Sequence, residues 1–102
     1  MAVLTATKDN LQSEVINSKQ TVLLDFHAPW CGPCRMIAPL VDQVANENPE
    51  IKVMKVNIDE EPELAGGFSI MSIPTLVVVK NGKELKRAVG ALPKSAILEM
   101  VK

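Results

Sequence analysis

The sequence predicts an α/β fold with a mixed central sheet and helices on both faces. Short apolar runs alternate along the chain with segments whose apolar residues recur at helical spacing, which is typical of strand–helix–strand units with parallel strands. Near the C-terminus, Asn81 and Gly82 separate two strand-like runs. This dipeptide is a strong signal for a two-residue hairpin, which joins antiparallel strands. Parallel units followed by a hairpin give a mixed sheet.

The first half of the chain contains two expected helices with a strand between them. Thr7 is a candidate N-cap for the first helix, whose apolar residues are Leu11, Val15 and Ile16. Residues 22–27 form a short run that is apolar on both faces, as in a buried central strand. A long helix is expected from Cys34 onward, with an apolar face made of Ile37, Leu40, Val41, Val44 and Ala45.

The second half adds three strands and two helices. Residues 51–58 are expected to form a second central strand, followed by the acidic run 59–63 and a short helix ending near Gly66 and Gly67. Residues 75–80 and 83–89 are the two strands of the hairpin. A last helix is expected to start at Pro93, since the first helical position does not need an N–H, and its apolar residues are Ile97, Leu98 and Val101.

Length and composition exclude several classes of protein. A chain of 102 residues, 47% of them hydrophobic, predicts a single domain over residues 1–102 with a core of its own. The net charge of -1 offers no basic face for nucleic acid. Residues 1–7 do not resemble a signal peptide, and no apolar run is long enough for a membrane span. We therefore expect a soluble, cytoplasmic protein with no nucleic-acid or membrane partner.

The most informative motif is Cys31-Gly32-Pro33-Cys34, which follows Trp30 and contains the only two cysteines of the chain. A zinc site needs about four ligands, and the single histidine leaves the set incomplete, so we expect no metal. A purely structural disulfide would close too short a loop to stabilise the fold much. Two unrelated buried thiols remain a third alternative, although the flanking Trp, Gly and Pro argue against chance. Reversible dithiol chemistry is favoured, above all in a reducing cytosol.

Cys31 is expected to be the nucleophile of this pair. Only a thiolate attacks a disulfide, and at a helix start the free N–H groups and the positive end of the helix dipole favour the thiolate. Cys34 lies three residues further on, is expected to be more covered, and would resolve the mixed disulfide. Gly32 and Pro33 keep the turn between the two thiols compact.

Asp25 is an acid within an apolar strand. Burial raises the pKa of a carboxyl group, which makes it a proton acceptor near neutral pH. We expect Asp25 to take the proton of Cys34 through water, and Lys55 on the neighbouring strand to tune it. Two plainer interpretations stay open, namely Asp25 as a surface acid at a strand edge and Lys55 as a solvent-facing lysine.

Taken together, the chain resembles the thioredoxin family from end to end. The residues that carry the resemblance are Asp25, Phe26, Ala28 to Cys34, Pro39, Lys55, Asn57 to Asp59, Ile73 to Thr75, Gly82 and Gly90. The resemblance implies the thioredoxin fold and a small electron carrier that reduces disulfides in target proteins. It implies no bound cofactor, with electrons supplied by NADPH or ferredoxin through a reductase. The implied partners of the monomer are thioredoxin reductase and targets such as ribonucleotide reductase, peroxiredoxin and methionine sulfoxide reductase.

The resemblance also implies a docking rim around Cys31. In the family a cis proline, here Pro74, faces the cysteines, and Trp30, Ile73, Gly90 and Ala91 would complete a flat apolar surface for extended peptides. On residues alone, Pro74 is an ordinary proline at a strand start. For Trp30, a place in the core stays open as the plainer alternative. The five methionines, Met1, Met36, Met54, Met71 and Met100, are interpreted as fillers of gaps in the core.

His27 stands where the family commonly has an aromatic residue. A charged imidazole would favour the Cys31 thiolate, whereas strand alternation could turn the ring away from both thiols. A second class of function also stays open, in which the same rim docks a partner as a structural subunit and no redox chemistry takes place. Replacing both cysteines separates the two classes.

Overall fold

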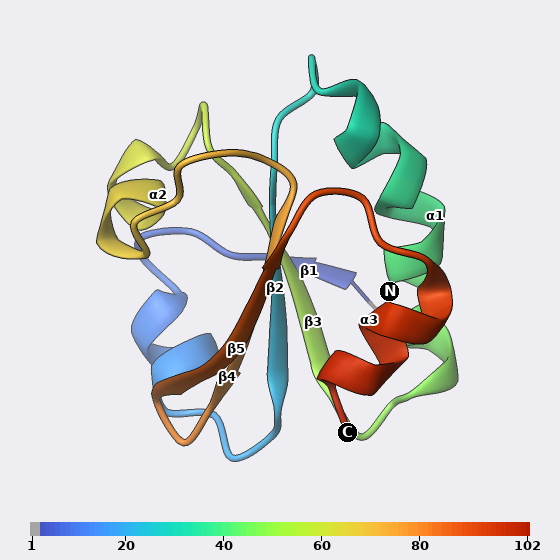
Figure 1. The fold of residues 1–102 in the computed structure, drawn as a ribbon. Coiled ribbons are helices and arrows are strands. Elements are labelled where there is room, and N and C mark those ends of the chain that lie inside the picture. Colours follow the sequence, from blue (N-terminus) through green and yellow to red (C-terminus); the bar gives the residue numbers. More distant parts are fainter. Residues whose placement is uncertain (1–2) are drawn as a thin grey trace.

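The computed structural model describes residues 3–102 and contains a five-stranded sheet in the order β1-β3-β2-β4-β5 (Figure 1). The strands are β1 (Val3–Thr5), β2 (Val22–His27), β3 (Lys52–Asn57), β4 (Thr75–Lys80) and β5 (Lys83–Val89). Strands β1, β3 and β2 run parallel, whereas β4 is antiparallel to β2 and β5 is antiparallel to β4. The expected mixed sheet is confirmed.

Helices cover both faces of this sheet, as predicted. The helices are η1 (Gln12–Ile16), α1 (Gly32–Glu47), α2 (Pro62–Gly67) and α3 (Lys94–Met100). Figure 1 shows α1 and α3 on one side of the strands, with α2 and the blue helix η1 on the other. None of these helices, within residues 3–102, is long and apolar enough to cross a bilayer.

Each face of the sheet has its own core. Leu23, Val53 and Leu76 face α1 and α3, where they pack with Ile37 and Ile97. The opposite core contains Leu24, Phe26, Met54, Val56 and Val77 from the strands, with Val15 of η1 and Leu64 of α2. Because side chains of a strand alternate between faces, β2 is buried on both sides, and its odd-numbered residues point toward α1.

The N-terminal region differs most from the prediction. Strand β1 was not predicted, and the first helix is a short π-helix that begins at Gln12. The N-cap of η1 is Leu11 and not the predicted Thr7. Thr7 instead caps the preceding turn: its Oγ1 accepts the N–H of Asn10 at 3.3 Å, and Asn10 Oδ1 accepts the N–H of Thr7 at 2.8 Å. These reciprocal bonds resemble a capping box, so the turn before η1 is closed by side chains.

The C-terminal hairpin has the expected strands and turn. Asn81 and Gly82 have φ values of 54° and 77°, as a type I′ turn requires. A Cβ on Gly82 would lie 3.1 Å from the carbonyl oxygen of Ile16, so the turn also packs tightly against η1. Beyond the hairpin, Pro93 is the N-cap of α3 and not its first helical residue, which shifts the predicted start by one position.

The interpretation of the methionines is wrong for two of them. Met54 is fully buried and Met100 packs against the core of α1 and α3. Met36 and Met71 are 71% and 93% exposed, because one lies on the outer face of α1 and the other in the loop before β4. Met1 lies outside the described residues.

Candidate active site

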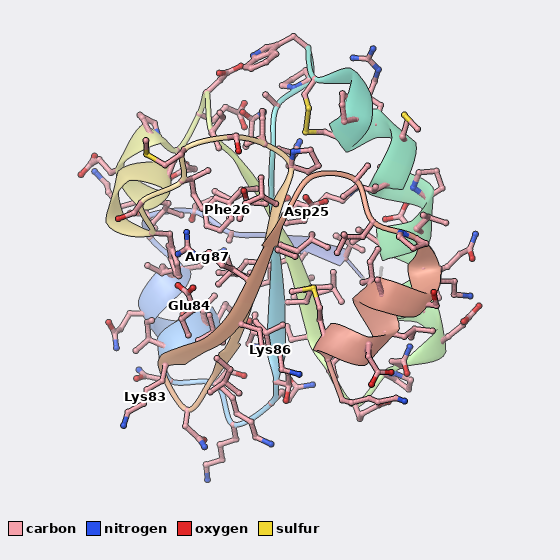
Figure 2. All side chains as sticks on the ribbon, in the orientation of Figure 1. Asp25, Phe26, Lys83, Glu84, Lys86 and Arg87 are labelled. Carbon is pink, nitrogen blue, oxygen red and sulfur yellow. A yellow bond between two sulfur atoms is a disulfide. The ribbon has the colours of Figure 1, made fainter. Side chains whose placement is uncertain are left out.

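The two cysteines lie where β2 ends and α1 begins. Cys31 is the N-cap of α1, and its Sγ accepts the backbone N–H of Cys34 at 3.2 Å. The two residues form a disulfide, with Cα atoms 5.2 Å apart, and Figure 2 shows this bridge at the start of α1. The N–H of Cys34 is one of the free donors of a helix N-terminus, and after reduction it can stabilise a Cys31 thiolate.

The bridge is covered on most sides. Cys31 and Cys34 are 5% and 3% exposed, so the expected difference in exposure is small. Ala28 clusters with the two cysteines, and Ile58 and Ile73 pack against this cluster. The Sγ of Cys31 lies 3.9 Å from the carbonyl oxygen of Ile73. A bridged sulfur carries no proton, so this approach is a contact in the oxidised protein and not a hydrogen bond.

The structure confirms that Asp25 is buried. It is 1% exposed, and its Oδ1 has no hydrogen-bond partner among residues 3–102. The interpretation of Asp25 as a surface acid is therefore wrong. Burial raises the pKa of the Asp25 carboxyl to about 6; the positive charge of Lys55 opposes this change and the negative charge of Asp42 adds to it. Such a carboxyl can accept a proton at neutral pH.

Lys55 lies beside Asp25 in the sheet but does not form an ion pair with it. The two residues are register partners of the parallel ladder between β2 and β3. The Lys55 ammonium instead pairs with Asp42 of α1, with 3.6 Å from Nζ to Oδ1. Its side chain is 25% exposed, so Lys55 is not the solvent-facing lysine of the plainer interpretation. It acts on Asp25 through space.

A cavity of about 280 Å³ brings the predicted proton-transfer residues together. It is lined by Asp25, His27, Ala28, Pro29, Cys34, Arg35, Ala38 and Lys55. A cavity of this size can hold several water molecules, at about 30 Å³ each. Cys34 and Asp25 therefore line one cavity, in which water can carry a proton from the thiol to the carboxylate.

His27 also faces this cavity, which neither sequence-based interpretation described. It lies two residues after Asp25 on β2, so both side chains point toward α1. Burial lowers the pKa of the His27 imidazole; the nearby Lys55 ammonium lowers it further and Glu60 opposes both. His27 therefore adjoins the cavity of Cys34 and is not part of the rim around Cys31.

Of the predicted rim residues, Ile73 packs against the cysteine cluster and Trp30 lies at the surface. Trp30 is 66% exposed, so its interpretation as a core residue is wrong. The Ile73–Pro74 peptide bond is cis, and the carbonyl oxygen of Pro74 accepts the N–H of Gly90 at 2.8 Å. Gly90 has a φ of 97°, and the next residue, Ala91, is exposed. This backbone contact places the segment after β5 beside the cis proline.

A second cavity, of about 330 Å³, adjoins the rim. It is lined by Trp30, Ile58, Ala65, Ile70, Met71, Ser72 and Ile73. None of these side chains is charged, so the cavity is suited to an apolar side chain. Trp30 and Ile73 are shared with the predicted docking rim.

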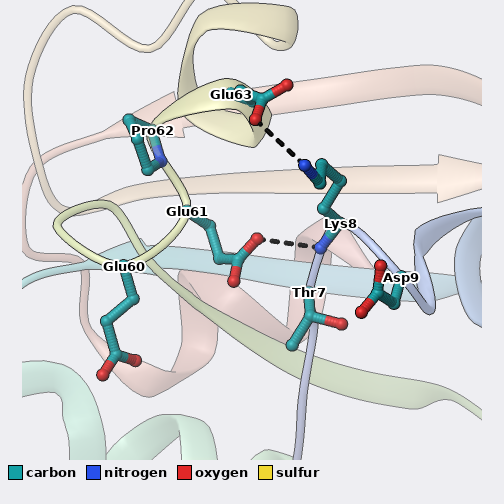
Figure 3. A pocket seen from close by; sticks show the side chains of 7 residues that line it. All are labelled: Thr7, Lys8, Asp9, Glu60, Glu61, Pro62 and Glu63. Atoms are coloured by element: carbon teal, nitrogen blue, oxygen red, sulfur yellow. Dashed lines mark hydrogen bonds and ion pairs between the residues drawn. The ribbon is translucent and has the colours of Figure 1, made fainter.

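The acidic run 59–63 does more than begin a helix. Asp59 accepts a hydrogen bond from Trp30, with 2.9 Å from Nε1 to Oδ2, which holds the exposed indole in one orientation. Lys8 donates two hydrogen bonds to this run (Figure 3). Its backbone N–H donates to Glu61 Oε1 at 2.8 Å, and its Nζ donates to Glu63 Oε1 at 3.3 Å. These partners are far apart in sequence, and no sequence signal pairs them. Across residues 3–102 no three His, Cys, Asp or Glu side chains converge on a metal position.

Comparison with known proteins gives one consistent result. The thioredoxin family model matches residues 2–102. Thioredoxin of Bacillus subtilis is 44% identical over 102 residues, which cover 99% of this chain and 96% of that protein. Thioredoxin of Pyropia yezoensis is 47% identical over 98 residues, covering 95% and 92%. The M-type chloroplastic thioredoxin of Chlamydomonas reinhardtii is 47% identical over 94 residues, covering 91% and 67%.

Proposed function

The chain belongs to the thioredoxin family and is a protein-disulfide oxidoreductase, and we propose that Cys31 is its attacking thiol and Cys34 its resolving thiol. The single observation that supports this division is the position of Cys31 as the N-cap of α1, with its Sγ on the N–H of Cys34. Hydrogen bonding to the charged form lowers the pKa of a thiol. Cys34 lies inside the first turn, and no N–H of residues 3–102 donates to its sulfur.

In the first step the Cys31 thiolate attacks one sulfur of a target disulfide. A mixed disulfide forms between Cys31 and the target, and the other target sulfur leaves with the electron pair and takes a proton from solvent. The N–H of Gly90 donates to the Pro74 carbonyl and so holds the segment after β5 against the Ile73–Pro74 backbone, which lies beside Cys31. An extended target segment would dock there against Trp30, Ile73, Gly90 and Ala91.

In the second step Cys34 releases the target. Its thiol gives a proton to Asp25 through water in the 280 Å³ cavity, and the resulting thiolate attacks the Cys31 sulfur. The target thiolate leaves, so the target gains two electrons and Cys31 and Cys34 become a disulfide. Lys55 tunes Asp25 by keeping its pKa lower than burial alone would. Gly32 and Pro33 hold the two thiols within one helical turn.

The protein would receive electrons from a reductase and pass them to target proteins. Residues 1–102 would act as one domain, monomeric and cytoplasmic, without a bound cofactor. A thioredoxin reductase would reduce the disulfide again, with electrons from NADPH or ferredoxin. Ribonucleotide reductase, peroxiredoxin and methionine sulfoxide reductase are the kinds of target that the family resemblance suggests.

Trapping of mixed disulfides tests the division of roles. Cys31→Ser should abolish the protein's catalysis of insulin reduction, measured as turbidity above the slow rate with dithiothreitol alone. Cys34→Ser should instead accumulate a covalent adduct with insulin through Cys31, visible on a non-reducing gel and located by peptide mass. Adducts through Cys34 in the Cys31→Ser protein would overturn the assignment. Partner activation that survives in the double Ser variant would favour a redox-independent binding module.

A further inference from the structure

His27 is a titratable side chain at the active site that the proposed function does not use. It is half-buried at the end of β2 and lines the same cavity as Asp25 and Cys34. We propose that His27 is a second proton acceptor for Cys34, which works through cavity water when Asp25 already holds a proton. This inference rests on the proposed function, because it concerns the same resolving step.

The geometry places two proton acceptors on one wall of the cavity. Asp25 and His27 lie two residues apart on β2, so their side chains leave the same face of the strand about 7 Å apart. Asp25 is 1% exposed, whereas His27 lies nearer to solvent. His27 is therefore placed to take a proton from cavity water and to return it to bulk solvent.

The other polar residues that line the cavity cannot fill this role. Arg35 and Lys55 carry cationic groups, which have N–H donors and no acceptor. The Arg35 guanidinium donates to the carbonyl of Pro29 at 2.7 Å, and the Lys55 ammonium pairs with Asp42. Ala28, Pro29 and Ala38 have no titratable side chain. Only the carboxyl and the imidazole remain as acceptors.

Burial and the charge of Lys55 favour the neutral form of the His27 imidazole. Lys55 on β3 and Arg35 on α1 line the cavity with positive charge, and Asp25 lines it with a carboxyl group. Asp42 pairs with Lys55, and Glu60 lies in the loop after β3. Burial and Lys55 together lower the pKa of His27, while burial raises that of Asp25 to about 6. Both shifts act in the direction that the proposal needs, because Asp25 is more readily protonated, and His27 more readily neutral, than the same groups are in water.

The chemical step balances without any further reactant. The Cys34 thiol loses its proton to cavity water, and that water passes a proton to His27. The Cys34 thiolate attacks the Cys31 sulfur of the mixed disulfide, and the target sulfur leaves with the electron pair. His27 then returns the proton to solvent, and the target thiolate takes one up.

Resolution can be measured alone with an aromatic disulfide probe. When reduced protein meets the bis(thionitrobenzoate) disulfide, Cys31 releases one coloured thionitrobenzoate and Cys34 releases a second. The rate of the second phase, followed by stopped-flow absorbance between about pH 5 and 8, reports proton removal from Cys34. The informative background is Asp25→Asn, where the first acceptor is absent. We compare it with Asp25→Asn/His27→Gln and Asp25→Asn/His27→Ala.

In the Asp25→Asn protein the second-phase rate should level off above the pKa of His27. In Asp25→Asn/His27→Gln the rate should be about a hundredfold lower near neutral pH, since general acid–base catalysis contributes about 10²-fold or more, and it should rise continuously with pH. Imidazole in solution should restore part of the rate to Asp25→Asn/His27→Ala, and the weak base pyrazole should not. Glu60→Gln in the Asp25→Asn background should move the plateau to lower pH, because Glu60 raises the pKa of His27.

The failures of the two proposals are distinguishable. Equal second-phase rates and pH profiles with and without His27, or no rescue by imidazole, would overturn the role of His27 and leave the roles of Cys31 and Cys34 intact. Loss of the first phase in Cys34→Ser, with retention in Cys31→Ser, would instead overturn the proposed function.

Discussion

Lys55 lies opposite Asp25 in the ladder between β2 and β3, yet its ammonium pairs with Asp42 of α1. This arrangement leaves the Asp25 carboxyl buried and without a charged hydrogen-bond partner among the residues that the structure describes. A direct ion pair would hold the carboxylate ionised and lower its basicity. Because Lys55 acts only through space, Asp25 keeps a pKa of about 6 and can both accept and release a proton near neutral pH.

This buried acid should cost the fold stability at neutral pH. The pKa of Asp25 is about 6 in the folded protein against an ordinary 3.8, so the folded state holds a proton that the unfolded chain has released. Stability therefore falls as the pH rises from about 4 to 6, by about 3 kcal/mol in total. Asp25→Asn should be about that much more stable at pH 7 and no more stable near pH 4.

Chemical unfolding at both pH values checks this prediction. Asp9→Asn, the same change at an exposed site, is the matched control and should change the denaturant midpoint little at either pH. A lower midpoint of Asp25→Asn at pH 7 would show that the carboxylate is stabilising and that its pKa is not raised.

Removing Lys55 should make Asp25 a base that works only at higher pH. The Lys55 ammonium lowers the pKa of Asp25, so Lys55→Gln should move the pH midpoint of the resolving step upward and slow this step a few-fold just above pH 6. Lys52→Gln is the control, because Lys52 lies on the same strand but pairs with Glu14, with 3.0 Å from Nζ to Oε1. An unchanged midpoint in Lys55→Gln would show that Asp42 screens the ammonium completely.

Local signals explain which parts of the fold could be predicted from the sequence. The hairpin over 75–89 was located correctly because Asn81 and Gly82 together specify a turn with positive φ. The strand around Asp25 was recognisable because it is apolar on both faces. Strand β1 has only three residues, and its conformation depends on parallel pairing with β3, which lies about 50 positions away. No local sequence pattern predicts strand β1.

In the candidate site, too, features with a local sequence signal could be predicted, and contacts between distant segments could not. The cysteine spacing and the buried acid can be recognised within a few residues of sequence, and the family resemblance supplied the cis proline. The bond between Trp30 and Asp59 and the pair between Lys55 and Asp42 join separate elements. Their partners are specified only by how α1 and the loop after β3 pack on the sheet. For the same reason the sequence could not show that His27 shares a cavity with Cys34.

The hairpin glycine offers a test of backbone strain with an internal control. Gly82 has a φ of 77°, and an added Cβ would lie 3.1 Å from the Ile16 carbonyl oxygen. Gly82→Ala should therefore lower the free energy of unfolding by about 1–2 kcal/mol. Gly66 lies in α2 with nothing within 4 Å of an added Cβ, so Gly66→Ala should raise it by about 0.5–1 kcal/mol. Changes of the same sign in urea unfolding would contradict this account.

The exposed indole of Trp30 should serve the docking of protein targets and not the thiol chemistry. Trp30 is 66% exposed and held by Asp59, so Trp30→Ala should change the stability little. Loss of its apolar area should raise KM for a protein disulfide about five- to tenfold, about 1 kcal/mol of binding free energy. The rate with a small disulfide such as the bis(thionitrobenzoate) disulfide should stay the same, because such a probe does not reach the rim. Met36→Ala is the control, since Met36 is 71% exposed on α1 and does not line the cavity beside Trp30. It should leave both substrates unaffected. An equal loss of Trp30→Ala activity toward both substrates would mean that the indole acts on the thiols themselves.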